Sequence, residues 1–143
     1  MHRYLVVGHH TLSGPRLLEE LQQLASHGPC AFHLVVPAEP PASHAWTESE
    51  ARSAAAARLD RAIERFAALD AEITSEIGDS NPILAVQDVL LRDPAFDAIV
   101  VSTLPPGPSR WLKLDLPHRL SEMTGLRVIH VVGSDEPVGS AGP

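Results

Sequence analysis

Short apolar runs alternate with longer amphipathic segments along the chain, which is the pattern of strands alternating with helices. Four apolar runs predict buried strands: residues 4–7, 31–36, 98–101 and 126–132. A fifth strand is predicted over residues 71–77, where apolar and polar residues alternate strictly. Because a strand with one polar face is half exposed, we expect this one at an edge of the sheet.

The segments between the strands predict helices. The first begins near Ser13-Gly14-Pro15, a polar residue followed by an early proline, and closes at Gly28, a residue suited to a left-handed C-terminal position. A long alanine-rich helix is predicted to begin at a capping box, Thr47 with Glu50, and to run to about Leu69. Three of its residues repeat at helical spacing and are expected to face the sheet: Leu59, Ile63 and Phe66. The proline-rich segment 37–41 before it is expected to be a loop.

The last two predicted helices are shorter. Asn81 with Pro82 caps one that runs to about Leu91, and the other follows a long loop, with Asp115 as its cap and Pro117 just inside. Strand and helix therefore alternate through five strands, and right-handed crossovers place helices on both faces of a parallel sheet. The predicted fold class is α/β, a three-layer α/β/α sandwich.

The length of 143 residues suits one ordinary domain. We expect that domain to span residues 1–132, and the segment 133–143, rich in Gly, Ser, Pro and acid, to be a disordered tail. No apolar run approaches the roughly 18 residues that cross a bilayer, and no signal-peptide layout is visible. The single cysteine, Cys30, is interpreted as a small buried hydrophobe. A cytoplasmic location is therefore expected.

The net charge of −7, from 18 acidic and 11 basic side chains, disfavours binding of nucleic acids and anionic membranes. The charge is uneven along the chain, because between residues 66 and 109 only Arg92 is basic, against seven acids. Three basic residues then follow within ten positions: Arg110, Lys113 and Arg119. The negative net charge therefore does not exclude a small anionic ligand at this basic segment.

Ligands of open parallel sheets bind outside the carboxyl ends of the strands, where the strand order reverses. Loops 8–11 and 102–114 follow the first and fourth strands, and we expect a nucleotide or small-anion site in the cleft between them. The candidate residues are His9, Thr11, Val36, Ser102, Thr103, Gly107, Ser109 and Arg110. The alternative is that the three basic residues simply lie on a solvated surface. Trp111 either stacks on a ligand, contributes to a dimer or anchors its loop, and anchoring is favoured.

His9 and His10 raise the question of a metal or acid–base site. Consecutive strand residues point to opposite faces, so this pair chelates poorly, and His33 and His130 are expected inside strands. The chain lacks a Gly-x-Ser-x-Gly elbow, a Gly-x-Gly-x-x-Gly turn and a Walker phosphate loop. We therefore assign no catalytic residue and no metal.

Three local segments accompany the five-strand alternation and the long second helix: Gly78-Asp79-Ser80-Asn81-Pro82 before the third helix, Phe96-Asp97-Ala98-Ile99-Val100-Val101, and Val128-Ile129-His130-Val131 as the closing strand. In these features, residues 3–132 resemble the universal stress protein family. The resemblance implies a Rossmann-like sheet of order 3-2-1-4-5. It also implies a homodimer formed through the last strand, near Val128, Ile129 and Val131. Some members of the family bind ATP and others do not.

The chain departs from the pattern of the ATP-binding members. Their motif after the fourth strand is a glycine, two residues, a glycine, nine residues, then glycine and serine or threonine. Counted from Ser102, those positions hold Ser102, Pro105, Asp115 and Leu116. The acidic residue that the family has near the end of its first strand falls near His9.

These observations favour a non-catalytic stress-response or regulatory protein with a degenerate nucleotide site. The candidate ligand of that site is ATP or another adenine nucleotide. A binding module for another small anion, between His9 and Arg110, is the first alternative. A nucleotide hydrolase or transferase that uses His9 or His10 as a general base is the weaker one.

Overall fold

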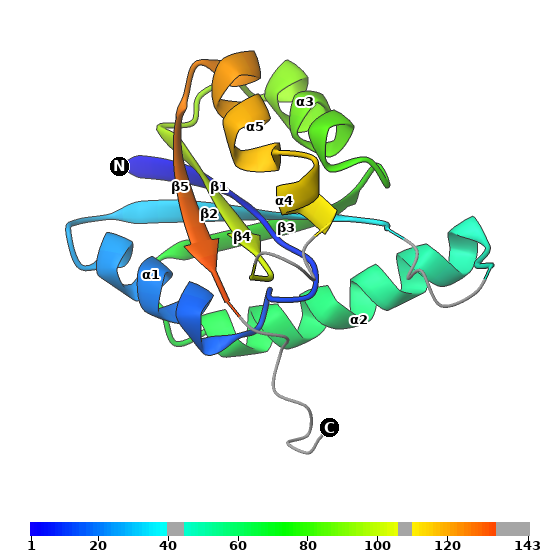
Figure 1. Cartoon of the computed structure of the whole chain (residues 1–143). Coiled ribbons are helices and arrows are strands. Elements are labelled where there is room, and N and C mark those ends of the chain that lie inside the picture. Colours follow the sequence, from blue (N-terminus) through cyan, green and yellow to red (C-terminus); the bar gives the residue numbers. More distant parts are fainter. Residues whose placement is uncertain (40–44, 106–109, 134–143) are drawn as a thin grey trace.

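Helices and strands alternate along the described chain, except that two helices follow each other before the last strand (Figure 1). The computed structural model describes residues 1–39, 45–105 and 110–133, and of Arg110 and Lys113 it describes the backbone alone. In chain order the elements are β1 (His2–Val7), α1 (Pro15–Ala25), β2 (Cys30–Pro37), α2 (Glu48–Phe66), β3 (Glu72–Gly78), α3 (Pro82–Arg92), β4 (Ala98–Thr103), α4 (Arg110–Lys113), α5 (Leu116–Thr124) and β5 (Arg127–Val132). The predicted tail, apart from Gly133, lies outside the described residues.

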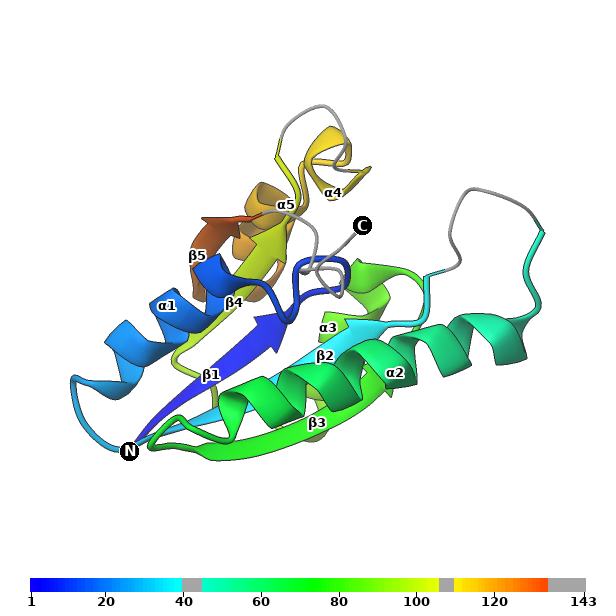
Figure 2. The same cartoon turned by 90° about the horizontal axis from the view of Figure 1, so that it is seen from below.

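The five strands form one parallel sheet in the order β3-β2-β1-β4-β5, which confirms the predicted fold class and strand order. Helices α1 and α2 cover one face of the sheet, and α3 and α5 cover the other (Figure 1). The carboxyl ends of β1, β2 and β4 point to the same edge (Figure 2). We call this the carboxyl edge, and the opposite one the amino edge.

The central strands explain why the sheet holds two separate apolar layers. Successive side chains of β1 alternate between the faces, so that Tyr4 and Val6 pack with α1 and α2 whereas Leu5 and Val7 pack with α3 and α5. Strand β4 is buried along its whole length. Such continuous burial is the property of a parallel strand covered on both faces.

The edge strand β3 lies where the alternating pattern predicts it, with no fully buried residue. One predicted core residue of α2 is wrong, because Ile63 is 37% exposed. The buried stripe of α2 consists instead of Ala51, Ala55, Leu59, Ala62 and Phe66. Because alanine side chains are small, the helix lies close to the sheet. Ala62 therefore faces the sheet, and the larger Ile63 beside it points partly to solvent.

Several element ends differ from the sequence prediction. Pro37 belongs to β2 and not to the loop that follows it. Ala38 N donates to Gly78 O of β3 at 3.1 Å, so the nitrogen of the preceding residue, Pro37, points to the other side, toward β1. The pairing of β2 with β1 has already ended at Val35. The missing N–H of the proline is therefore not needed there.

Two helix ends also differ. Gly14, and not Ser13, occupies the N-cap of α1, without a side-chain cap. That helix ends before Ser26, earlier than predicted, whereas Gly28 has the positive φ, 140°, that favours glycine. Among the described residues, no helix combines the length and the hydrophobicity needed to cross a membrane.

Candidate functional site

The floor of the carboxyl edge is formed by polar side chains that the fold buries. Strand β1 ends at Val7, and the chain turns sharply at Gly8, where a Cβ atom would lie only 2.9 Å from Leu12 Cδ1. A larger residue at this position would displace the buried side chain of Leu12, so glycine fits the turn best. His9, Thr11 and Ser102 are each at most 4% exposed.

A hydrogen bond connects the turn after β1 with β4, at the point where the strand order reverses. The Thr11 and Ser102 hydroxyls lie 2.5 Å apart, and either can be the donor. Each hydroxyl thus meets the hydrogen-bonding requirement of the other in a buried place. The contact ties the turn after β1 to the last residues of β4.

His9 is also buried at the carboxyl edge and does not project into solvent. Its ring is 4% exposed and packs at an angle of 65° against the half-buried ring of His10, with the ring centres 4.6 Å apart. The two histidines therefore make a packed pair and not a pair of chelating side chains. Among the described residues, no group of three His, Cys, Asp or Glu side chains is placed to hold a metal ion.

The floor continues toward the outer strand through Thr103. Its hydroxyl lies 2.7 Å from His130 Nε2, and its carbonyl accepts from Gly133 N at 2.9 Å. Partial desolvation of its ring lowers the pKa of His130, although the residue as a whole is exposed on β5. His130 thus favours its neutral form beside the Thr103 hydroxyl.

The structure brings together only part of the predicted site. His9, Thr11, Ser102 and Thr103 meet at the carboxyl edge, but Ser102 and Thr103 are residues of β4 and not of the loop after it. Val36 is fully buried in the core cluster beneath α1 and α2, so its side chain does not line a cleft. Arg110 begins α4. Gly107 and Ser109 lie outside the described residues.

Trp111 anchors its segment to the body of the fold, which was the favoured interpretation. The side chain is 6% exposed, packs with the α3 and α5 cluster, and donates its indole N–H to Glu39 Oε2 at 2.5 Å. Glu39, which the sequence analysis missed, follows β2. Nothing local in the sequence signals this contact, because the two residues stand 72 positions apart.

Beside this contact lies a hollow of about 280 Å³, which we call the α3–α5 hollow. Its lining residues are Glu39, Ser80, Asn81, Pro82, Ile83, Trp111, Leu114, Leu116 and Arg119. The hollow lies at the carboxyl edge, on the face covered by α3 and α5.

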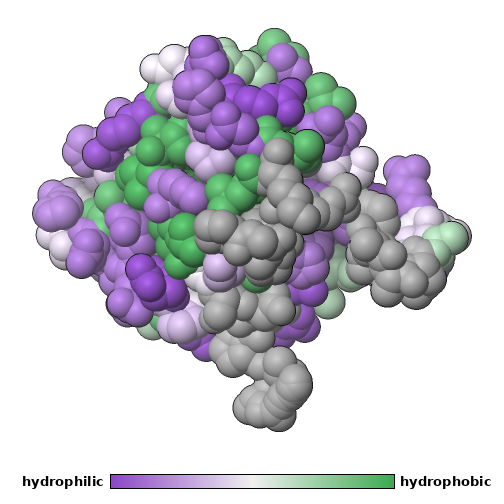
Figure 3. Space-filling model, viewed as in Figure 1, coloured by the Kyte–Doolittle hydropathy of each residue, from purple (hydrophilic) through white to green (hydrophobic). Residues whose placement is uncertain are grey.

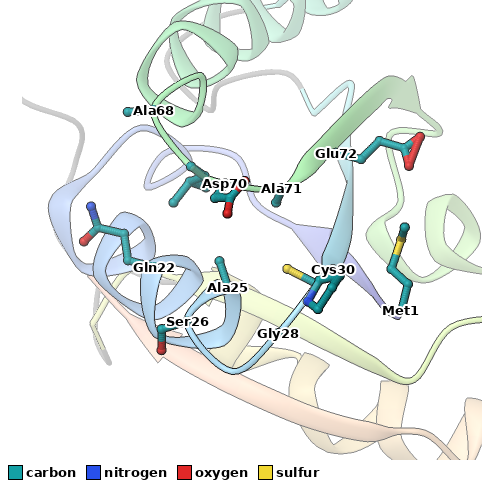
Figure 4. A pocket seen from close by; sticks show the side chains of 12 residues that line it. Met1, Gln22, Ala25, Ser26, Gly28, Cys30, Ala68, Asp70, Ala71 and Glu72 are labelled. Carbon is teal, nitrogen blue, oxygen red and sulfur yellow. The ribbon is translucent and has the colours of Figure 1, made fainter.

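A second hollow, of about 820 Å³, lies at the amino edge between the ends of α1 and α2 (Figure 4). Cys30 lines it and is buried, and burial raises the pKa of its thiol. A buried thiol with a raised pKa is unreactive. This agrees with the structural interpretation of Cys30.

Comparison with known proteins identifies the fold. No protein-family model matches the chain, and no curated protein matches it. Among solved structures, a universal stress protein in complex with cAMP is similar over 93% of this chain and 98% of that one, with a TM-score of 0.60 and 16% identity. A universal stress protein from Archaeoglobus fulgidus covers 92% of this chain and 93% of its own, with a TM-score of 0.48 and 12% identity. The chain therefore has the Rossmann-like fold of universal stress proteins.

Proposed function

We propose that this chain is a non-catalytic stress-response or regulatory protein that carries a degenerate nucleotide site at the carboxyl edge of its sheet. The observation that carries the proposal is the similarity of fold, over nearly the full length of both chains, to a universal stress protein in complex with cAMP. The buried Thr11–Ser102 pair lies where the strand order reverses, which is the place where open parallel sheets bind ligands.

The degeneracy is supported by the residues after β4. Glycines in a phosphate-binding loop let backbone amides approach the phosphates closely. Whether the motif is counted from Ser102, Thr103 or Leu104, only Gly107 coincides with one of its glycines. Pro105 and Pro106 also remove two backbone N–H donors from the same stretch.

Calorimetric titration with ATP, AMP and cAMP, with magnesium present, tests this proposal. We expect a Kd on the order of 1 mM or weaker for ATP, because the sequence keeps at most one glycine of the phosphate-binding motif. A micromolar Kd would contradict the degenerate site. Where weak binding is measured, Thr11→Val should weaken it further, whereas the control Ser26→Ala, at the far end of α1, should leave it unchanged.

A second candidate function is the binding of another small anion between His9 and Arg110. The local concentration of basic residues in an acidic chain favours it. Thermal-shift measurements with inorganic phosphate and sulfate test it: Arg110→Ala should abolish the stabilisation, and Arg65→Ala at the end of α2 should not. An unchanged response in Arg110→Ala would exclude this site.

Catalysis by His9 or His10 is the weakest candidate. A general base must reach the proton that it removes, and the His9 ring is packed into the floor. We expect no phosphate release from nucleoside triphosphates. Turnover that His9→Ala or His10→Ala abolishes would replace the non-catalytic proposal.

We also propose a homodimer that forms through β5. This strand is an edge of the sheet, with Val128 and Ile129 half-buried and Val131 inside the core of its own chain. The face of the molecule that carries β5 exposes apolar surface between polar patches (Figure 3). An edge strand with such side chains is a template for pairing. We also propose the cytoplasmic location that the sequence analysis predicts.

A further inference from the structure

The α3–α5 hollow has walls of two kinds. Its apolar lining residues are Ile83, Leu114, Leu116 and Trp111. The indole is held in place because it is buried and its N–H is already bonded to Glu39. An apolar ligand group would therefore meet a preformed surface and would not have to order it.

The polar lining residues Ser80, Asn81 and Arg119 carry hydrogen-bond donors. Asn81 Oδ1 accepts from Ile83 N at 2.9 Å and from Leu84 N at 3.4 Å, which leaves its Nδ2 group as a donor. In the described part of the chain, the Ser80 hydroxyl, Asn81 Nδ2 and the Arg119 guanidinium make no hydrogen bond or ion pair with protein side chains. The one acidic side chain of the lining, Glu39, accepts the Trp111 N–H.

We propose that the α3–α5 hollow binds a small aromatic monocarboxylate, with its ring against Trp111 and its carboxylate on Arg119. The planar guanidinium pairs with a carboxylate through two parallel hydrogen bonds, and Ser80 and Asn81 supply further donors. This ligand class differs from the nucleotide proposed above. The lining of the hollow also contains none of His9, Thr11 and Ser102.

Size and charge select this ligand class over larger or more highly charged anions. A cavity of about 150 Å³ holds benzene, and pockets for drug-sized ligands measure roughly 300–1,000 Å³. A hollow of about 280 Å³ thus suits one ring with a short acidic group. Glu39 in the same lining opposes a second negative charge, which disfavours a phosphate dianion.

Titration of the full chain with benzoate, with benzamide as the uncharged isostere, tests the proposal. The indole N–H signal of Trp111 in ¹⁵N-labelled protein is the readout, and Trp46 supplies a second indole signal, identified with Trp46→Phe. We expect a saturable shift of the Trp111 signal with a Kd on the order of 1 mM for so small a probe. Benzamide should bind at least tenfold more weakly, because it lacks the charge that Arg119 recognises.

Two variants separate specific binding from general effects of charge. Arg119→Gln should weaken benzoate binding at least tenfold while the other amide signals stay in place, whereas Arg127→Gln, at the start of β5, should not change it. Equal binding of benzoate and benzamide, equal effects of the two arginine variants, or no saturable shift would each overturn the proposal. ATP titrated into the same Arg119→Gln sample should behave as with the unchanged chain, so the nucleotide proposal is tested separately.

Discussion

Arg3 joins two segments of the chain at the amino edge of the sheet. Its guanidinium donates to both carboxylate oxygens of Asp93, at 2.6 and 3.1 Å, and to the Ala95 carbonyl at 2.7 Å. It also lies 4.4 Å from the centre of the Phe96 ring. The hydrogen bond from Arg3 lowers the pKa of Asp93 below its ordinary value. The start of β1 is thereby fixed to the segment between α3 and β4.

The lowered pKa predicts a pH-dependent contribution to stability. A carboxyl group whose folded-state pKa lies below its unfolded value stabilises the fold above the unfolded pKa of about 3.9, and this contribution is lost as the pH falls through the folded value. Arg3→Gln should therefore lower the free energy of unfolding at neutral pH, and its difference from the unchanged chain should shrink below about pH 4. Urea unfolding across this range is the measurement. A difference that stays constant with pH, as we expect for the control Arg65→Gln, would contradict the role of the pair.

The corrected face of α2 leads to a second prediction. Phe66 is fully buried, whereas Ile63, three residues earlier, is 37% exposed. Phe66→Ala should lower the free energy of unfolding by about 3–5 kcal/mol through the cavity that it leaves. Ile63→Ala should change it by less than about 1 kcal/mol, since alanine also has the higher helix propensity. Comparable losses in urea unfolding would mean that the helix presents the other face.

At the scale of single elements, the capping box of α2 is the local signal that the structure confirms most directly. Glu50 N donates to Thr47 Oγ1 and Thr47 N donates to Glu50 Oε1, each at 3.0 Å. Both bonds join residues three positions apart, so the sequence alone specifies them. A cap of this kind satisfies two backbone donors that the helix itself cannot.

Thr47→Ala should therefore cost about 1 kcal/mol of unfolding free energy, within a range of about 0.5–2 kcal/mol. Thr47→Ser keeps the accepting oxygen and should stay within about 0.5 kcal/mol of the unchanged chain. Urea unfolding followed by far-ultraviolet circular dichroism measures both. Equal losses in the two variants would show that the methyl group of Thr47, and not its hydroxyl, matters.

Other elements could not be predicted because their cause lies far away in the chain. The short helix α4 has no periodic pattern of its own, and its Trp111 is held by Glu39, 72 positions earlier. Likewise, Thr11 and Ser102 are 91 positions apart, and only the parallel pairing of β1 with β4 brings their hydroxyls together. The sequence predicted which strand ends would meet, but not which side chains would be buried there.

At the scale of the whole molecule, the arrangement of the sheet was predictable and its ligand chemistry was not. Alternating strands and helices with right-handed crossovers leave few arrangements, and the chain adopts the one expected. The chemistry of the carboxyl edge depends instead on a few long-range contacts. The α3–α5 hollow combines residues after β2, before α3 and on α5, so no contiguous motif could have indicated it.

The proposed dimer leads to a last prediction about the two edges of the sheet. Ile129 on β5 and Ile73 on β3 are both half-buried edge residues that pack against the same core cluster, so lysine at either position should cost the fold a similar amount. Only Ile129 lies on the strand proposed to pair with its copy across a two-fold axis.

Sedimentation of the unchanged chain should give twice the mass of 15.4 kDa. Ile129→Lys should give monomers at the same concentration, because pairing would bury the introduced ammonium group, whereas Ile73→Lys should stay dimeric. If the unchanged chain is a monomer at every concentration, or if both variants dissociate alike, β5 is not the pairing edge.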